Sequence, residues 1–282
     1  MFPDSGPEMR GKTMKIAVIG TGFHATGDDL PPREISEIAA PGFEARLVEQ
    51  RLPAFPINQI NRTLSEVATI EAGLNAAERG FDAIFINTVG DYGLASLRSA
   101  LPIPVIGAGQ ATMHAAAQLG ERFSIVTIWP ESLRFIYTHL LRIYGMERHC
   151  VSVRCVAMDD ELPSLGDDEN FVTDMRQGER SQIDRIVAAC DAAIREDGAD
   201  TIMLGCTCMS PIARDIAARC RAPTLNPLTT GYKAAEMTLA LGVSHSGLAY
   251  QRTGGAGLDQ FRVMADAVIG LEDDEPSAAA AE

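Results

Sequence analysis

An internal repeat constrains the fold of this chain more than any other feature of its sequence. Residues 82–120 and 200–242 both contain, in order, a strand, a loop, a helix, a strand led by proline, a loop and a helix. Duplication of an ancestral half explains the pattern, although two units that converged on one fold would produce part of it. The matched positions are Asp82 with Asp200, Thr88 with Cys206, Pro104 with Pro223, and Ala115–Ala116 with Ala234–Ala235.

Short apolar runs alternate with helical patterns along the chain, which predicts an α/β fold with parallel sheets covered on both faces. The predicted strands are 15–20, 44–49, 82–87, 104–107, 123–128, 151–156, 200–205 and 223–226. The predicted helices lie near 62–79, 92–100, 111–119, 132–144, 180–197, 210–220 and 230–241.

The repeat predicts two pseudo-symmetric four-stranded parallel-sheet lobes, an N-terminal α/β lobe at 14–120 and a C-terminal one at 121–242. We expect the last helical region to pack back on the first lobe, and 1–13 and 271–282 to be disordered tails. Ligands of open α/β sheets bind beyond the carboxyl ends of the strands. An active site in the cleft between the lobes follows, with Thr88 facing Cys206.

Composition narrows the classes of partner. A net charge of −14 argues against a nucleic-acid surface, which needs clustered Lys and Arg. No apolar run approaches the roughly 18 residues of a membrane helix, and the N-terminus lacks the apolar segment of a secretory signal. We therefore expect a cytoplasmic protein with reduced thiols, since its six cysteines form no CxxC pair.

Cys206 is the first candidate for chemistry, because it follows a strand and precedes a predicted helix. Backbone N–H groups and the helix dipole stabilise a thiolate at such a position. Cys208 is expected either to line the site or to tune Cys206, and the other four cysteines to be structural. A zinc site is not expected, because CxC supplies two ligands and no histidine cluster accompanies it.

The loops at the predicted strand ends are rich in small polar residues, which offer N–H and hydroxyl groups to a carboxylate or imide ligand. The alternative is that these residues only form turns. Trp129 would form an apolar wall of the same site, although core packing explains its position almost as well. The candidate binding residues are Thr21, Gly22, Asn87, Val89, Gly90, Trp129, Thr207 and Cys208.

Several of these segments resemble the aspartate/glutamate/hydantoin racemase superfamily. LGCTCMSP (204–211) is similar to its second-cysteine motif, and FINTVGDYGL (85–94) with PVIGAGQATMHAA (104–116) resembles the first-cysteine region of the hydantoin racemase branch. SIVTIWPESL (124–133) and VSVRCVAMDD (151–160) also fit that branch. The resemblance covers about 14–242.

The resemblance implies a cofactor-independent isomerase that acts at the carbon alpha to a carbonyl of a small acid, amino acid or hydantoin. Typical members place one cysteine on each face of the substrate. Here the first of these positions is Thr88, the first loop reads GTGFH, and Cys208 replaces a histidine of glutamate racemases. Cys206 is then the main acid/base, and Thr88 donates a hydrogen bond or relays a proton. Family members are usually dimers or larger, so we expect a homo-oligomer.

Other interpretations stay open. A single cysteine also suits a decarboxylase or a cis-trans isomerase of a small dicarboxylic acid, or a protein that only binds small acids. His24 is a candidate second acid/base, although an ordinary loop histidine is the simpler interpretation. GTGFHA (20–25) fits a dinucleotide fingerprint, with Glu44 or Glu49 as the ribose acid. The prolines that follow it break the helix which such a site requires.

Overall fold

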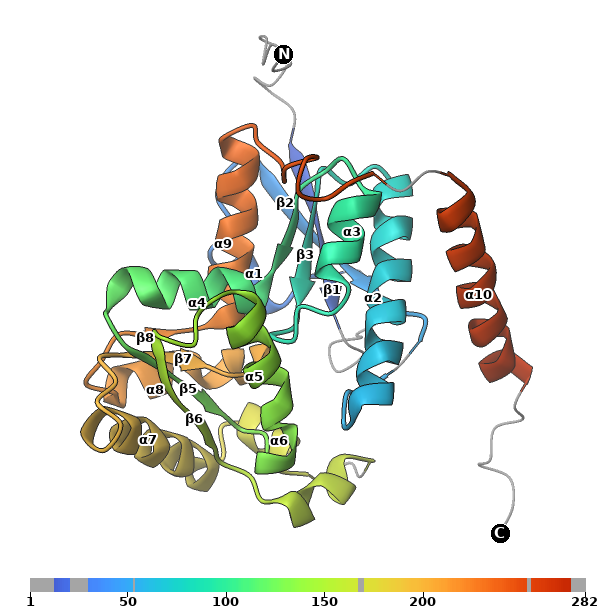
Figure 1. The fold of residues 1–282 in the computed structure, drawn as a ribbon. Coiled ribbons are helices and arrows are strands. Elements are labelled where there is room, and N and C mark those ends of the chain that lie inside the picture. The colour runs from blue at the N-terminus through green and yellow to red at the C-terminus, as the bar shows by residue number, and fades with distance from the viewer. Residues whose placement is uncertain (1–12, 21–29, 53, 167–169, 253–254, 275–282) are drawn as a thin grey trace.

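The computed structural model describes residues 13–20, 30–52, 54–166, 170–252 and 255–274, and it contains two parallel four-stranded sheets (Figure 1). The strand order is β2-β1-β3-β4 in the first sheet and β6-β5-β7-β8 in the second. The strands are β1 (Met14–Gly20), β2 (Phe43–Glu49), β3 (Ala83–Asn87), β4 (Val105–Gly107), β5 (Phe123–Thr127), β6 (Cys150–Cys155), β7 (Thr201–Leu204) and β8 (Thr224–Leu225).

Helices cover both faces of the sheets, and every residue of β3 and of β5 is buried. This confirms the predicted α/β architecture, in which apolar runs become central strands. The α-helices are α1 (Arg33–Ser36), α2 (Gln59–Glu78), α3 (Leu94–Ala100), α4 (Ala108–Leu119), α5 (Arg134–Ile143), α6 (Phe171–Arg176), α7 (Arg180–Arg195), α8 (Ala213–Arg219), α9 (Pro227–Ala240) and α10 (Gly255–Asp274). The 3-10 helices are η3 (Glu131–Leu133), η4 (Asp159–Gly166) and η5 (Thr207–Ile212).

Aligned positions of the repeat make equivalent hydrogen bonds in the two halves. In each half the aligned aspartate donates its N–H to the start of the first strand, and the aligned proline accepts an N–H from the third strand. The bonds are Asp82 N to Lys15 O at 2.8 Å and Asp200 N to Arg122 O at 2.8 Å, then Ile84 N to Pro104 O at 2.9 Å and Ile202 N to Pro223 O at 2.8 Å. The two halves that repeat in the sequence therefore also share the same backbone hydrogen bonds at these positions.

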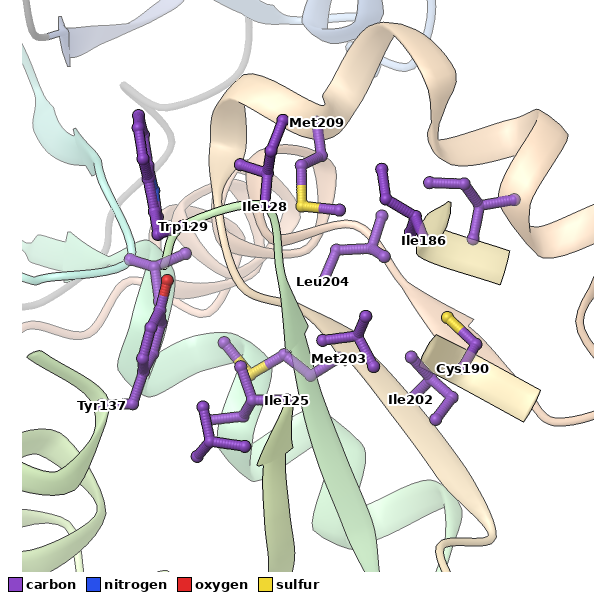
Figure 2. Packing of buried hydrophobic residues seen from close by; sticks show 14 of the residues in the cluster. Ile125, Ile128, Trp129, Tyr137, Ile186, Cys190, Ile202, Met203, Leu204 and Met209 are labelled. Atoms are coloured by element: carbon purple, nitrogen blue, oxygen red, sulfur yellow. The ribbon is translucent and has the colours of Figure 1, made fainter. Parts of the chain in front are cut away.

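The helix that ends each half contributes to the core of the other half. Met113 and Ala116 of α4 belong to the apolar core around β5 and β7, which Figure 2 shows from close by. Leu228 and Tyr232 of α9 belong to the core beneath β1 and β3. The α4 and α9 helices also contact each other (Figure 1). Because each of these two helices packs in the core of the other half, this arrangement holds the two sheets together.

Some elements have no counterpart in the sequence prediction. The short helices α1 and α6 and the long helix α10 are the clearest cases, and α10 packs on α2 through Leu258 and Phe261. The α10 helix continues to Asp274, so the tail predicted from 271 onward begins inside it. No helix within the described ranges combines the length and the apolar character needed to span a bilayer.

Candidate active site

One pocket lies at the carboxyl ends of β3 and β7, and Thr88 and Cys206 both line it. The space between its lining atoms amounts to about 610 Å³, which includes open solvent. Six of the predicted binding residues line it too: Asn87, Val89, Gly90, Trp129, Thr207 and Cys208. The remaining lining residues are Phe55, Pro56, Tyr92, Ile136, Tyr137, Val172 and Gly205.

Tyr137 of α5 supports the loop that carries Cys206 through a hydrogen bond to its backbone. The Tyr137 hydroxyl donates to the carbonyl oxygen of Gly205 at 2.8 Å and shares a 2.6 Å hydrogen bond with Thr127. Burial raises the pKa of Tyr137 far above its usual range, so the hydroxyl keeps its proton and remains a donor. Glycine is needed at position 205, because a Cβ there would lie 2.4 Å from the Cβ of Thr127.

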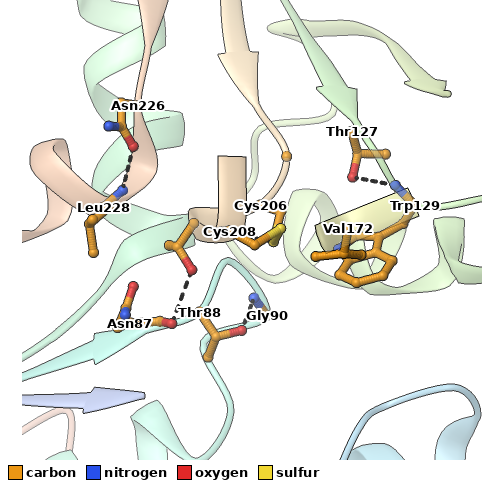
Figure 3. The surroundings of a disulfide bond; sticks show 12 residues. Asn87, Thr88, Gly90, Thr127, Trp129, Val172, Cys206, Cys208, Asn226 and Leu228 are labelled. Atoms are coloured by element: carbon orange, nitrogen blue, oxygen red, sulfur yellow. Dashed lines mark hydrogen bonds between the residues drawn. A yellow bond between two sulfur atoms is a disulfide. The ribbon is translucent and has the colours of Figure 1, made fainter. Parts of the chain in front are cut away.

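Cys206 and Cys208 form a disulfide, which corrects the prediction that the cysteines of this chain are reduced thiols (Figure 3). The physical reason is local geometry. Residue 206 is extended and η5 begins directly after it, which brings the two Cα atoms to 5.2 Å, within the usual range for bridged cysteines. Cys150, Cys155, Cys190 and Cys220 are free.

A hydrogen bond connects the two active-site loops directly. The Thr207 hydroxyl donates to the backbone oxygen of Asn87 at 3.2 Å (Figure 3). In the opposite loop, the Thr88 hydroxyl accepts the N–H of Gly90 at 3.3 Å. The Thr88 hydroxyl therefore still has its own proton to donate to a ligand.

The side chain of Asn87 is buried without compensation. It is 1% exposed, and neither its Oδ1 nor its Nδ2 has a hydrogen-bond partner in the described part of the chain. Burying an amide in this way costs free energy. Because Asn87 lines the pocket, a ligand that both donates and accepts hydrogen bonds would satisfy it.

Aromatic and aliphatic side chains make one wall of the pocket. The Trp129 ring lies 4.9 Å from the ring of Phe55 and 5.8 Å from that of Phe171, in edge-on contact with the latter. Trp129 is 7% exposed, so it belongs both to the core and to the pocket lining. Ile136 and Val172 extend the same wall.

Asp91 is a buried carboxylate beside the Thr88 loop that the sequence analysis did not single out. Its Oδ1 accepts the N–H of Gly109 at 2.8 Å, and its Oδ2 accepts the N–H of Gln110 at 2.6 Å and the hydroxyl of Tyr144 at 2.8 Å. Burial raises the pKa of Asp91 to about 6, although these donors and the charge of Arg98 oppose the shift. The available signal was a lone acidic residue between glycines, in VGDYG.

Three candidates from the first loop cannot be placed, because Thr21, Gly22 and His24 lie outside the described residues. His114 is exposed on α4 and contacts the backbone oxygen of Gln110 at 2.8 Å. Among the described residues, no three or more His, Cys, Asp or Glu side chains are grouped so that they would hold a metal ion.

Comparison with known proteins gives one consistent result. Residues 36–235 match the model of the Asp/Glu/hydantoin racemase family. A hydantoin racemase from Rhizobium meliloti is 34% identical over 168 residues, an alignment that covers 60% of this chain and 64% of that relative.

Solved structures agree with this match. An allantoin racemase from Klebsiella pneumoniae superposes with a TM-score of 0.72 at 28% identity, covering 86% of this chain and 95% of the other. An allantoin racemase from Pseudomonas fluorescens superposes with a TM-score of 0.74 at 25% identity, covering 86% and 98% of the two chains.

Proposed function

Since the chain belongs to the Asp/Glu/hydantoin racemase family, we propose that it is a cofactor-independent racemase or epimerase. It acts at the carbon alpha to a carbonyl of a small acid, amino acid or hydantoin, with Cys206 as the main acid/base. The observation that carries this proposal is that Cys206 and Thr88, matched positions of the repeat, follow matched strands and line one pocket.

Within that range, a hydantoin is the substrate that suits the pocket best. The unpaired amide of Asn87 would bind the –CO–NH– edge of such a ring, with Oδ1 accepting and Nδ2 donating. A carboxylate accepts only, and it would leave Oδ1 unpaired. The wall around Trp129 would contact an apolar substituent on the reacting carbon. The names of the relatives point to the same class of ring.

The chemistry assigned to each residue follows from its functional group. The Cys206 thiolate removes the proton from the alpha carbon, and the electron pair moves onto the adjacent carbonyl to give a planar enolate. Return of a proton to the opposite face inverts the configuration, whereas return to the same face restores the starting enantiomer. Thr88 hydrogen-bonds a substrate oxygen or relays a proton through water on the opposite face, because its hydroxyl does not ionise near neutral pH. His24 remains the candidate second acid/base.

The disulfide sets a condition for this activity. A disulfide sulfur carries no transferable proton, so Cys206 can act only after its bond to Cys208 has been reduced. In the disulfide form, the backbone N–H of Cys208 donates to the Cys206 sulfur at 3.1 Å. After reduction, Cys208 lines the pocket as a thiol.

Proton NMR in D2O tests the proposal. The reduced protein is incubated with enantiomers of amino acids and 5-substituted hydantoins, and with substituted malonates. Loss of the Cα–H signal together with loss of optical rotation is the expected result for a hydantoin. No exchange with any amino acid or hydantoin would refute the proposed activity.

A second candidate follows from the threonine at position 88. One thiol is enough to protonate one face of an enediolate after loss of CO2, so decarboxylation of a substituted malonate also suits this site, and cis-trans isomerisation of a dicarboxylic acid suits it in the same way. Release of CO2 with a single product enantiomer would favour the decarboxylase. Binding of small acids without turnover would favour a binding protein.

We also propose that the protein is a cytoplasmic homo-oligomer that takes a small carboxylate or imide substrate. Small α/β domains commonly associate symmetrically. The exposed apolar side chains of Ile60 and Leu64 on α2 are available for such contacts. A monomeric mass by light scattering at micromolar concentration would contradict the oligomer.

A further inference from the structure

Asp91 is a buried acid for which the proposed reaction has no direct use. It is 5% exposed, and three hydrogen-bond donors surround its carboxylate. It is also the one non-glycine residue with a positive φ, 48°, in the described part of the chain. Such a conformation is uncommon and is retained where the surrounding structure fixes it.

The backbone of Asp91 closes the turn that carries Thr88. The N–H of Asp91 donates to the backbone oxygen of Thr88 at 3.2 Å, and the Thr88 hydroxyl lies inside the same turn. The carboxylate lies against the first turn of α4 so closely that a Cβ on Gly107 would lie 2.3 Å from its Oδ1. A Cβ on Gly109 would lie 2.2 Å from the backbone oxygen of Val89. The absence of a side chain at both glycines therefore leaves the space that the Asp91 carboxylate and the Val89 backbone occupy.

The carboxylate connects this loop to elements that pack on the other sheet. Met113 and Ala116 of α4 belong to the core around β5 and β7, as does Val89 of the loop itself. Tyr144 ends α5, the helix whose Tyr137 supports the Cys206 loop. Asp91 thus links the Thr88 turn to the body that carries Cys206.

We propose that Asp91 is a positioning residue, whose carboxylate fixes the Thr88 turn against α4 and α5 and so sets where the Thr88 hydroxyl meets the substrate opposite Cys206. The inference rests on the proposed function for its catalytic consequence. The matched position of the second half is Met209, so this connection belongs to the Thr88 side alone.

Two substitutions test the connection. Asp91→Asn keeps the shape but places an NH2 group where an oxygen faces an N–H donor, and Tyr144→Phe removes one donor while keeping the ring. Ser124→Ala is the matched control. It removes a buried hydroxyl that contacts Ser152 at 2.7 Å, near the start of β5 and outside the pocket lining.

Kinetics of the reduced proteins give the first readout. We expect Asp91→Asn to lower kcat/KM about 10- to 100-fold through misplacement of the turn, and Tyr144→Phe to lower it less, with Ser124→Ala near wild type. In a Thr88→Val background, Asp91→Asn should add little, because its effect passes through Thr88. Losses that multiply in full in the double variant, or an equal loss in Ser124→Ala, would overturn the proposal.

Amide hydrogen exchange gives a readout that does not need activity. Peptides covering 88–93 should exchange faster in Asp91→Asn and Tyr144→Phe than in wild type, while peptides covering 204–209 and both regions of Ser124→Ala should not change. Unchanged protection of 88–93 in both variants would refute the anchoring itself. If the wild type turns over no substrate, the proposed function fails, and this measurement still decides the role of Asp91.

Discussion

Cys206 and Thr88 occupy matched positions of the repeat, yet their side chains differ in the property that acid/base chemistry needs. An unperturbed thiol has a pKa of about 8.5, so a helix terminus can bring it into the working range. A threonine hydroxyl ionises far above that range. The site is therefore asymmetric even though the two sheets that build it have the same topology.

Substitution should show this asymmetry. We expect Cys206→Ser to lower exchange of the alpha proton about 10²- to 10⁴-fold, because the hydroxyl cannot serve as the base. Thr88→Ser should have a mild effect, since the hydroxyl stays. Cys155→Ser, at a half-buried cysteine of β6, is the control for loss of a thiol elsewhere. Full activity of Cys206→Ser would remove the basis for the catalytic role of this loop.

Thr88→Cys places a second thiol on the opposite face. In the reduced protein, exchange into D2O should then proceed from both enantiomers at comparable rates, whereas the wild type should favour one. Proton NMR on the separate enantiomers measures the ratio. A wild type that already exchanges both equally would show that Thr88, or a neighbour such as His24, acts as a base.

Activity should depend on the redox state of the Cys206–Cys208 pair. A dithiol reductant converts the disulfide to two thiols and is itself oxidised to a disulfide. We expect turnover to appear as free-thiol titration gains these two groups. Peptide mass analysis must identify the thiols, because Cys220 is also free and its hydrogen bond with Cys190 lowers its pKa to about 6. Equal turnover before and after reduction would contradict the assignment of Cys206.

At the scale of elements, the helix that ends each half also supports the active-site loop of its own half. The cap of α9 is an example: Oδ1 of Asn226 accepts the N–H of Leu228 at 3.1 Å, and its Nδ2 donates to the Ser210 hydroxyl at 2.7 Å. Ser210 belongs to η5, the element that follows Cys206. The Asn226 side chain thus caps the start of α9 and also holds η5 in place.

Asn226→Ala should therefore have two effects. Loss of the helix cap should lower the free energy of unfolding by about 1 kcal/mol, and loss of the contact with η5 should lower kcat/KM. Asn58→Ala is the matched control, because Asn58 caps α2 through the N–H of Asn61, and neither residue lines the pocket. Urea unfolding and kinetics on both variants separate the effects. Equal losses of kcat/KM in the two variants would mean that the loss of a helix cap, and not the loss of the contact with η5, reduces activity.

At the scale of the whole molecule, the buried acid between the sheets makes stability depend on pH. Asp91 has a pKa of about 6 in the fold against 3.8 as its ordinary value, because burial disfavours the charged form. The folded state therefore binds this proton more tightly than the unfolded state. This contribution to stability is complete below about pH 4 and is lost as the pH rises through 6.

The difference between wild type and Asp91→Asn should show this contribution. From pH 4 to pH 7, the free energy of unfolding of the wild type should fall by up to about 3 kcal/mol more than that of the variant, because the amide does not titrate. The Tyr144 hydroxyl and the Arg98 charge stabilise the ionised carboxylate of Asp91. They therefore limit the rise of its pKa and the size of this difference in stability. Urea denaturation at several pH values measures it. Parallel pH profiles would contradict the raised pKa.

The sequence by itself determined the parallel sheets, their repeated order and the loops that carry Thr88 and Cys206. These features depend on local patterns, namely apolar runs of strand length and small polar residues at strand ends, and on the rule that parallel strands place their carboxyl ends at one edge. Matched residues such as Asp82 and Asp200 could therefore be aligned without coordinates.

Only the tertiary structure decided the packing of α4 on the core around β5 and β7, the three donors around Asp91, the wall formed by Phe55 and Val172, and the bond between Cys206 and Cys208. Most of these contacts join residues that are distant in the chain. Their partners are selected by packing, by close approach of backbone at Gly107 and Gly109, and by the need to pair buried polar groups. The disulfide is local, but it depends on the turn that η5 makes after Cys206, which composition and spacing do not specify.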